Sequence, residues 1–139
     1  MAYSLSIAPD GSVVELVATG AGSSAGFAHV IAAMLEHPLY RRGAPILIDR
    51  RESVDLPTTR EVRSNVSTLA RHRDALGSCR IAVVVTSAAA YGMARMGQAL
   101  ADDLPIVIRI FSEETEARRW LREGTDVTDR EAEVNSDDR

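Results

Sequence analysis

The chain has 139 residues, of which 45% are hydrophobic and 26% are charged, and its formal net charge is −4. This length supports one domain with a hydrophobic core, and the composition excludes a fibrous or wholly disordered protein. All 16 basic residues are arginine. The absence of lysine excludes mechanisms that need one, such as a Schiff base or the phosphate-binding lysine of a P-loop.

Charge is unevenly distributed along the chain. Residues 1–122 hold 14 arginines against 13 acidic residues, a net charge of +1, whereas residues 123–139 hold two arginines against seven acids, a net charge of −5. A nearly neutral body lacks the concentrated basic face that nucleic-acid binding needs, so we predict no nucleic-acid partner. We predict one domain over residues 1–122, followed by an acidic, poorly ordered tail over residues 123–139.

Several features suggest a protein of the cytoplasm. No apolar run approaches the roughly 18–20 residues that a transmembrane helix needs, so we predict no transmembrane segment. The first residues, Met1–Ile7, lack the basic region and long apolar core of a secretory signal. The single cysteine, Cys79, cannot form an internal disulfide, which fits a reducing compartment.

The N-terminal part predicts a hairpin, a helix and a strand. Tyr3–Ile7 alternates in polarity and is followed by the turn sequence Pro9-Asp10-Gly11 and by Val13–Ala18, which predicts two antiparallel strands. After a loop of small residues comes a helix that Ser23 or Ser24 would cap and that Pro38 would end. Its apolar stripe comprises Phe27, Val30, Ile31, Met34 and Leu35.

A short buried strand, Pro45–Ile48, follows and closes at Asp49, and Arg50–Pro57 reads as a polar loop. Thr58 and Glu61 have the spacing of a capping box, in which each side chain bonds the other's backbone amide. The helix that they begin would bury Val62, Val66, Leu69 and Ala70 and end near Gly77.

The C-terminal part predicts two further strand-helix units. Cys79–Val85 and Ile106–Phe111 are nearly continuous apolar runs. Between them, a helix over Tyr91–Leu100 would place Met93, Met96, Gly97 and Leu100 against the core. Ser112 would cap a last helix that turns Ala117, Trp120 and Leu121 inward.

The predicted order is therefore β-β-α-β-α-β-α-β-α. Strands that are apolar on both faces are typical of a parallel sheet covered by helices. We predict an α/β fold with about five strands in a mostly parallel sheet, an N-terminal antiparallel hairpin and four helices. Right-handed crossovers place the β-α loops at one end of such a sheet, where open α/β sheets bind ligands.

The loop Gly20–Gly26 matches two incompatible motifs. As a relaxed dinucleotide-binding sequence it would pair with Asp49, but its spacing departs from the motif and the chain has too few strands. As a Gly-x-Ser-x-Gly element it would use Ser24, Asp49 and His72, yet His72 is expected at the far end of its helix. A loop of small residues before a helix is the interpretation that we prefer. We predict no catalytic residue and no cofactor.

Metal binding has no support in the spacing of potential ligands. His29, His37 and His72, together with Cys79, do not repeat on one face of any predicted element. We therefore predict no metal site.

Several segments resemble the SpoIIAA-like group of STAS domains, the bacterial anti-sigma-factor-antagonist type. The segments that carry the resemblance are Ile46–Asp49, Ala82–Ser87, Tyr91–Met96, Ile108–Phe111 and Glu116–Leu121, and it extends over residues 3–121. The resemblance implies a small cytoplasmic domain of regulatory type, without catalytic chemistry, that binds a protein partner or a small ligand. Many members of the group are uncharacterised.

The resemblance also raises the alternative of a phosphorylation-controlled partner switch. Antagonist proteins are phosphorylated on a serine that follows an Asp, at the start of the helix after the third strand. The Asp-Ser pair is absent here, and Thr58 and Thr59 are the nearest hydroxyls. A phosphate at either would meet a helix N-terminus and Arg60 or Arg63.

Our leading hypothesis is a non-enzymatic STAS-like binding module that forms a homodimer. Its ligand or partner would contact the β-α loop end of the sheet. The candidate binding residues there are Arg50, Arg51, Thr86, Ser87 and Tyr91. A less favoured alternative is a nucleotide-dependent or hydrolytic enzyme that uses the Gly20–Gly26 loop.

Overall fold

A computed structural model describes residues 2–20, 24–53 and 56–124. The elements are β1 (Ala2–Ile7), β2 (Val14–Gly20), α1 (Ser24–Glu36), β3 (Ile46–Ser53), α2 (Thr59–Arg71), α3 (Arg73–Leu76), β4 (Arg80–Val84), α4 (Ala88–Leu100) and β5 (Val107–Phe111). Residues 114–124 form one more helix, called here the C-terminal helix. None of the helices within the described residues is long and apolar enough to cross a bilayer.

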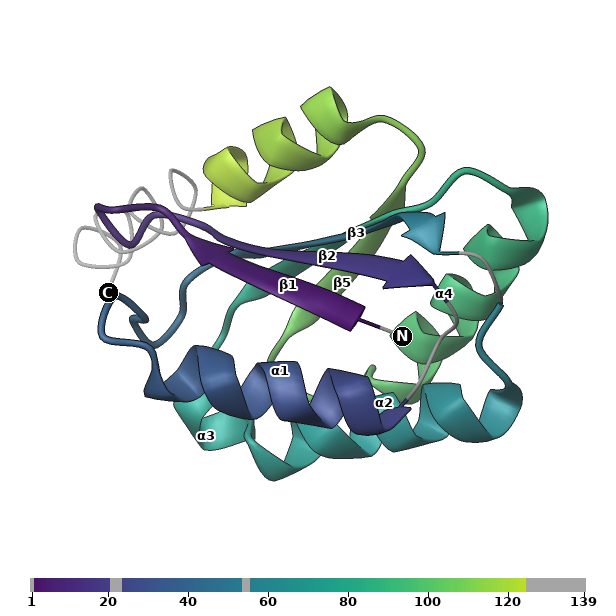
Figure 1. Cartoon of the computed structure of the whole chain (residues 1–139), viewed down its shortest axis with the longest axis horizontal. Coiled ribbons are helices and arrows are strands. Elements are labelled where there is room, and N and C mark those ends of the chain that lie inside the picture. Colours follow the sequence, from purple (N-terminus) through teal and green to yellow (C-terminus); the bar gives the residue numbers. More distant parts are fainter. Residues whose placement is uncertain (1, 21–23, 54–55, 125–139) are drawn as a thin grey trace, which may run out of the picture.

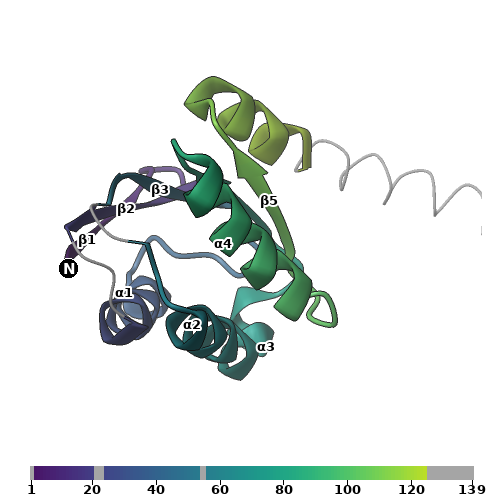
Figure 2. The ribbon, with the colours of Figure 1, turned by 90° about the vertical axis from the view of Figure 1, so that its right-hand side faces the viewer.

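The five strands form one sheet in the order β1-β2-β3-β4-β5. Strands β1 and β2 are antiparallel, and every other pair is parallel. Because successive strands are added in one direction, right-handed crossovers place α1, α2 and α4 on the same face of the sheet. The C-terminal helix covers the opposite face (Figures 1 and 2). The predicted fold class is confirmed.

The core has two parts, one on each face of the sheet. The larger lies under the crossover helices and includes Leu16, Ile31 and Ile46, all at most 1% exposed. The smaller lies under the C-terminal helix, where Ala117, Trp120 and Leu121 pack on strand residues. Central strands buried on both faces cannot alternate in polarity, which explains the continuous apolar runs in the sequence.

Strand β3 is longer than the sequence suggests. Arg50–Pro57 is predicted as a loop, but residues 50–53 continue the strand to Ser53. The reason is pairing with β2, whose Thr19 and Gly20 lie opposite Glu52 and Ser53 beyond a register shift after Val17. Backbone hydrogen bonds to a neighbouring strand hold these polar residues in an extended conformation. The pattern of polar and apolar residues gives no sign of such hydrogen bonds.

Two helices also differ from the prediction. The helix after Thr58 ends at Arg71, and His72 adopts φ −106° and ψ 16° before the separate single turn α3. The described residues therefore contain five helical segments where four are predicted. Helix α4 begins at Ala88 rather than Tyr91, since Ser87 caps it, and the predicted core residue Leu100 is 41% exposed.

The capping box at the start of α2 is confirmed. The Thr58 hydroxyl accepts a hydrogen bond from the Glu61 amide at 3.1 Å, and the Glu61 carboxylate accepts one from the Thr58 amide at 2.9 Å. The C-terminal helix includes residues 123 and 124. The rest of the predicted tail, residues 125–139, lies outside the described residues, as does Ser23.

The capping box predicts different effects for two adjacent threonines. Thr58→Ala removes the acceptor for the Glu61 amide and should lower the free energy of unfolding by about 1 kcal/mol. Thr59→Ala, at an exposed first helical position, should change it by less than about 0.5 kcal/mol. Urea denaturation followed by circular dichroism measures both, and equal losses for the two variants would contradict the capping role.

Candidate functional site

A cavity of about 100 Å³ lies between the sheet and helices α2 and α4. Its lining is mostly apolar and includes Phe27, Ile48, Pro57, Val62, Val66, Leu69, Ile81, Val83, Ala90, Met93, Ala94, Gly97 and Ile108. Among the described residues that line it, only Arg50, Asn65 and Gln98 are polar. An apolar pocket with a few polar groups is the usual form of a small-molecule site.

Arg50 enters the cavity from β3. Side chains alternate along a strand, so Arg50 shares with Ile46 and Ile48 the face that the crossover helices cover. Its Nη1 donates a hydrogen bond to the Tyr3 hydroxyl at 2.8 Å. Its Nη2 is buried and has no hydrogen-bond partner among the described residues. The cavity thus contains a guanidinium with a free donor.

Tyr3 fixes the position of this guanidinium. Its ring packs edge-on against Phe27, with 5.9 Å between the ring centroids. Burial raises the pKa of the Tyr3 phenol, and this exceeds the opposing effect of the nearby Arg50 charge. The phenol therefore stays neutral and accepts a hydrogen bond from Arg50 without neutralising its charge.

Asn65 interrupts the apolar face of α2. Val62, Val66 and Leu69 lie on the same side of the helix, and all of them line the cavity. The Asn65 Oδ1 atom is buried and has no hydrogen-bond partner in the part of the chain that the structure describes. Gln98 differs, because its Nε2 donates to the Ile108 carbonyl at 2.6 Å. Arg50 and Asn65 therefore carry the two unpartnered buried polar atoms of the cavity.

Such atoms are uncommon in folded proteins. A buried donor or acceptor without a partner costs about 1–3 kcal/mol of stability, more when it is charged, and each case calls for an explanation. Both unpartnered atoms here belong to residues of one cavity, and neither lies in a loop or at a terminus. A ligand or ordered water that bonds to them would remove the penalty.

Helix α4 forms a loosely packed wall of the cavity. None of its residues is fully buried, and the strand that it chiefly contacts is the edge strand β5. Ala90, Ala94 and Gly97 present little side-chain volume to the cavity. At Gly97 a Cβ would lie 3.5 Å from Val62 Cγ1, so the two helices are already in contact there. Small residues on α4 therefore leave space over the sheet without separating the helices.

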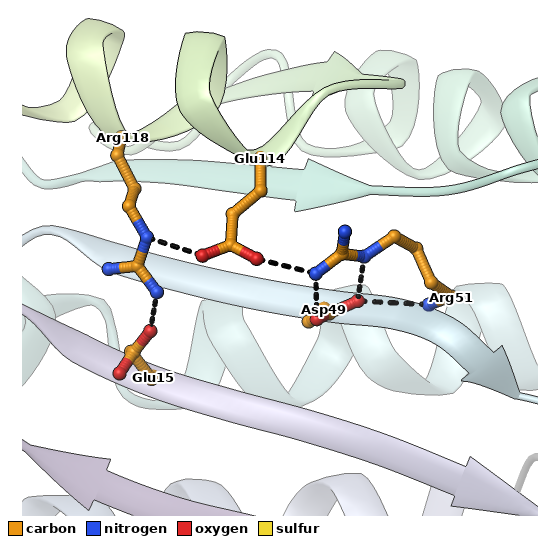
Figure 3. A network of polar contacts seen from close by, with 5 residues as sticks. All are labelled: Glu15, Asp49, Arg51, Glu114 and Arg118. Atoms are coloured by element: carbon orange, nitrogen blue, oxygen red, sulfur yellow. Dashed lines mark hydrogen bonds and ion pairs between the residues drawn. The ribbon is translucent and has the colours of Figure 1, made fainter.

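Arg51 lies on the opposite face of the sheet, where it joins a chain of charged residues (Figure 3). It contacts Asp49 at 2.7 Å and Glu114 of the C-terminal helix at 2.5 Å. Glu114 in turn binds Arg118 at 2.7 Å, and Arg118 binds Glu15 of β2. These ion pairs attach the C-terminal helix to β2 and β3.

The structure does not bring the predicted site residues together. Arg50 and Arg51 point to opposite faces, because consecutive residues of a strand do so, and neither lies in a loop. Ser87 caps α4 by accepting from the Ala90 amide at 3.1 Å, while Thr86 and Tyr91 are exposed. Of the five candidates, only Arg50 lines the cavity.

Asn65 is the residue that sequence reasoning missed. The available signal was an amide side chain inside the apolar stripe of a helix, between Val62 and Leu69. For the proposed phosphorylation sites, Thr58 holds the capping bond and Thr59 is exposed at the first position of α2.

The residues of the possible hydrolase triad are not assembled. The Asp49 carboxylate accepts hydrogen bonds from the backbone and guanidinium of Arg51, which lower its pKa despite partial burial. It lies on the sheet face under the C-terminal helix, whereas α1, which begins at Ser24, covers the other face. His72 caps the far end of α2. Residues 21–23 of the glycine loop lie outside the described residues.

Metal ligands do not converge in the part of the chain that the structure describes, where no three His, Cys, Asp or Glu side chains could hold an ion together. Burial raises the pKa of the Cys79 thiol to about 11, which keeps it protonated and unreactive near neutral pH.

Comparison with known proteins identifies the fold. No family model matches the sequence, and no curated protein matches it. A solved structure does match: an uncharacterized protein of the DUF3478 family, with a SpoIIAA-like fold, from Shewanella loihica PV-4. The TM-score is 0.59 at 15% identity, and the match covers 86% of this chain and 92% of the other. The fold is SpoIIAA-like. At this identity the likeness concerns the fold alone.

The ion pairs of Asp49 predict a pH-dependent stability. Because its pKa is lower in the folded protein, Asp49 stabilises the fold above its unfolded pKa of about 3.9, and this contribution disappears as the pH falls through the folded value. Asp49→Asn should lower the free energy of unfolding by about 1–2 kcal/mol at pH 7. The difference from the native chain should shrink below about pH 4.

Urea denaturation between pH 3 and pH 8 measures this difference. Glu52→Gln is the control, since Glu52 is exposed on the same strand and makes no ion pair with a described residue. A loss for Asp49→Asn that stays constant down to pH 3 would contradict the assignment.

Proposed function

We propose that this domain is a non-enzymatic binding module of the cytoplasm that holds a small molecule with an anionic head and a short apolar body. The ligand would occupy the cavity under α2 and α4. The observation that carries the proposal is the pair of unpartnered buried polar atoms, Arg50 Nη2 and Asn65 Oδ1, in an otherwise apolar space.

The guanidinium of Arg50 favours an anion. Within the described residues no carboxylate forms an ion pair with it, and its one hydrogen-bond partner is a neutral phenol. Arg50 is partly buried, a position where a charge without a counter-charge is unfavourable, and a carboxylate matches guanidinium geometry. An acid group would also supply the acceptor that Nη2 lacks.

The cavity limits the size of the rest of the ligand. An apolar cavity of about 150 Å³ is known to hold benzene, which has six non-hydrogen atoms. The cavity here, at about 100 Å³, fits a hydrocarbon part somewhat smaller than benzene, with the acid group of the ligand placed at Arg50. Its aliphatic walls suit a short hydrocarbon chain. Short-chain monocarboxylates such as propionate and butyrate are therefore the probes of choice.

The cavity reaches the end of the sheet where ligands are expected. Phe27, Pro57 and Ala90 belong to the beginnings of α1, α2 and α4 or to the residues just before them, which follow the carboxyl ends of the strands. Open α/β sheets bind ligands at this end of the sheet, which supports the proposal. The contribution of Arg50 comes from the strand itself rather than from a loop.

Ordered water is the competing occupant. A cavity of this volume has room for about three water molecules, and waters often bridge buried polar groups. Water would satisfy Arg50 Nη2 and Asn65 Oδ1, but it gains nothing from the apolar lining. The two explanations differ in whether a short fatty acid binds more tightly than acetate.

A titration followed by NMR tests the proposal on the full chain. Propionate and butyrate should shift the amide signals of residues around Arg50 and Asn65 and bind more tightly than acetate, because each added methylene contributes up to about 0.8 kcal/mol. Neutral butyramide should bind at least about tenfold more weakly than butyrate, since it carries no charge for Arg50.

Two arginine variants provide the matched comparison. Arg50→Leu should abolish butyrate binding, whereas Arg51→Leu, on the other face of the sheet, should leave it unchanged. Folding of both variants is verified by circular dichroism. Failure of every acid to shift the signals, or equal binding by the two variants, would refute the proposed function.

Stability provides a second, independent prediction. Asn65→Leu replaces an unpartnered amide by an apolar side chain of similar size, and it should raise the free energy of unfolding by about 1 kcal/mol. The variant should also bind butyrate more weakly. Ser67→Leu, on the exposed side of α2, serves as the control and should not be stabilising. A destabilised Asn65→Leu would mean that the amide has a structural partner.

A further inference from the structure

Strand β5 is one of the two edges of the sheet, and only β4 pairs with it within the described residues. The Val107 amide donates to Cys79 at 2.9 Å, and the Phe111 carbonyl accepts from Val85 at 3.0 Å. Backbone groups alternate in direction along a strand, so those of Ile108 and Ile110 point away from the sheet.

A side chain already uses one of these outward groups. Gln98 of α4 donates to the Ile108 carbonyl at 2.6 Å. This contact agrees with the alternation of backbone groups along β5, which turns the Ile108 carbonyl away from β4. The amides of Ile108 and Ile110 and the carbonyl of Ile110 remain, and no described residue pairs with them. An edge of this kind is a template for another strand.

The edge lies in a groove of about 450 Å³ between two helices. Tyr91 and Arg95 of α4 line it on one side, and Trp120 of the C-terminal helix lines it on the other. Figure 2 shows β5 between these two helices. Val107, at the start of the strand, is 54% exposed, and Tyr91 is 43% exposed. An extended chain in this groove would cover both.

The groove is basic. Arg80, Arg95 and Arg109 line it, and none of its described lining residues is acidic. Arg80 lies over the Trp120 ring at 4.7 Å and donates to the Trp120 carbonyl, and Arg109 lies 5.6 Å from the centre of the Phe111 ring. These contacts place guanidinium groups on the sheet face under the C-terminal helix, while Arg95 adds a charge on the α4 side.

We propose that the β5 edge binds an extended acidic segment of a partner protein, which pairs with Ile108 and Ile110 as a sixth strand. Successive side chains of that segment point to opposite faces. Acidic residues on one face meet Arg109, and those on the other meet Arg95. Backbone pairing supplies affinity and the alternating side-chain contacts supply specificity, as in other cases of strand addition.

A second copy of this chain is a poorer occupant of the same edge. Two β5 strands paired about a two-fold axis would bring the basic groove of one copy against the same groove of the other. Like charges that face each other across a strand pair are destabilising. The charge of the edge therefore favours an acidic segment over the β5 strand of a second copy. The homodimer expected from the sequence finds no support at this edge.

Labelled peptides test the proposal with the full-length protein. The probe is fluorescein-Glu-Asp-Val-Glu-Asp-Val, and the charge control is the same peptide with lysine at every acidic position. Fluorescence anisotropy in 50 mM salt should show saturable binding of the acidic peptide and at least tenfold weaker binding of the basic one. Binding of both peptides alike, or of neither, would overturn the proposal.

Two N-methylated forms of the acidic peptide distinguish strand pairing from simple charge attraction. One form carries methyl groups on the amides of its odd residues and the other on those of its even residues. Only one set faces β5, so one form should lose binding and the other should keep it. Retention of binding by both forms would show attraction without pairing and would refute the sixth strand.

Hydrogen exchange and a variant pair locate the peptide. Exchange of the Ile108 and Ile110 amides should slow at least tenfold when the acidic peptide is bound. Arg109→Glu should weaken binding roughly tenfold, whereas Arg63→Glu, exposed on α2, should not. Unchanged exchange at both amides would overturn the proposal. The proposal would also be overturned if sedimentation detected a dimer without peptide in which the Ile108 and Ile110 amides are already protected from exchange.

Discussion

The strand order is the constraint on which the rest of the structure depends. Each parallel strand is added on the same side of the previous one, so every right-handed crossover returns its helix over the same face. That face is filled by three helices, and the opposite face has none until the chain has completed β5. Leu47, Ala82 and Val84 on that face are at most 2% exposed only because the C-terminal helix covers them. The ion pairs that link Glu114 and Arg118 to Asp49, Arg51 and Glu15 fix that helix in place.

This arrangement gives the two neighbouring arginines of β3 opposite roles. On the C-terminal-helix face, Arg51 finds two carboxylates and completes the attachment of the helix. On the crossover face, Arg50 finds Tyr3 and an apolar cavity. Pairing two partly exposed ions contributes modestly to stability, whereas a partly buried guanidinium without a counter-charge opposes folding. Arg50 is therefore hard to explain by stability alone, and a bound anion gives it a reason to be there.

The sequence predicted the fold better than it predicted the site, and the reason is physical. Apolar periodicity reports which side of an element faces the core, and it located every strand and the inward face of the C-terminal helix, including Trp120 and Leu121. Residues 50–53 were assigned to a loop because their position depends on backbone pairing with β2, which leaves no trace in polarity. That error placed Arg50 and Arg51 on one surface. Asn65 stands out in the sequence as an amide within an apolar stripe, but the sequence does not show that its Oδ1 lacks a partner among the described residues.

Helix α4 connects the two surfaces to which we assign binding. Gln98 lines the cavity and the edge groove, and its amide occupies the Ile108 carbonyl that an added strand would otherwise use. No residue of α4 is fully buried, so its packing resists displacement less than that of α1, which contributes Ile31 and Met34 to the core. A strand that competes with Gln98 for the Ile108 carbonyl would disturb α4, which forms a wall of the cavity. By thermodynamic linkage, any effect of the peptide on the affinity for the small acid must equal the effect of the acid on the affinity for the peptide. The loosely packed helix is thus the element through which the two sites would communicate.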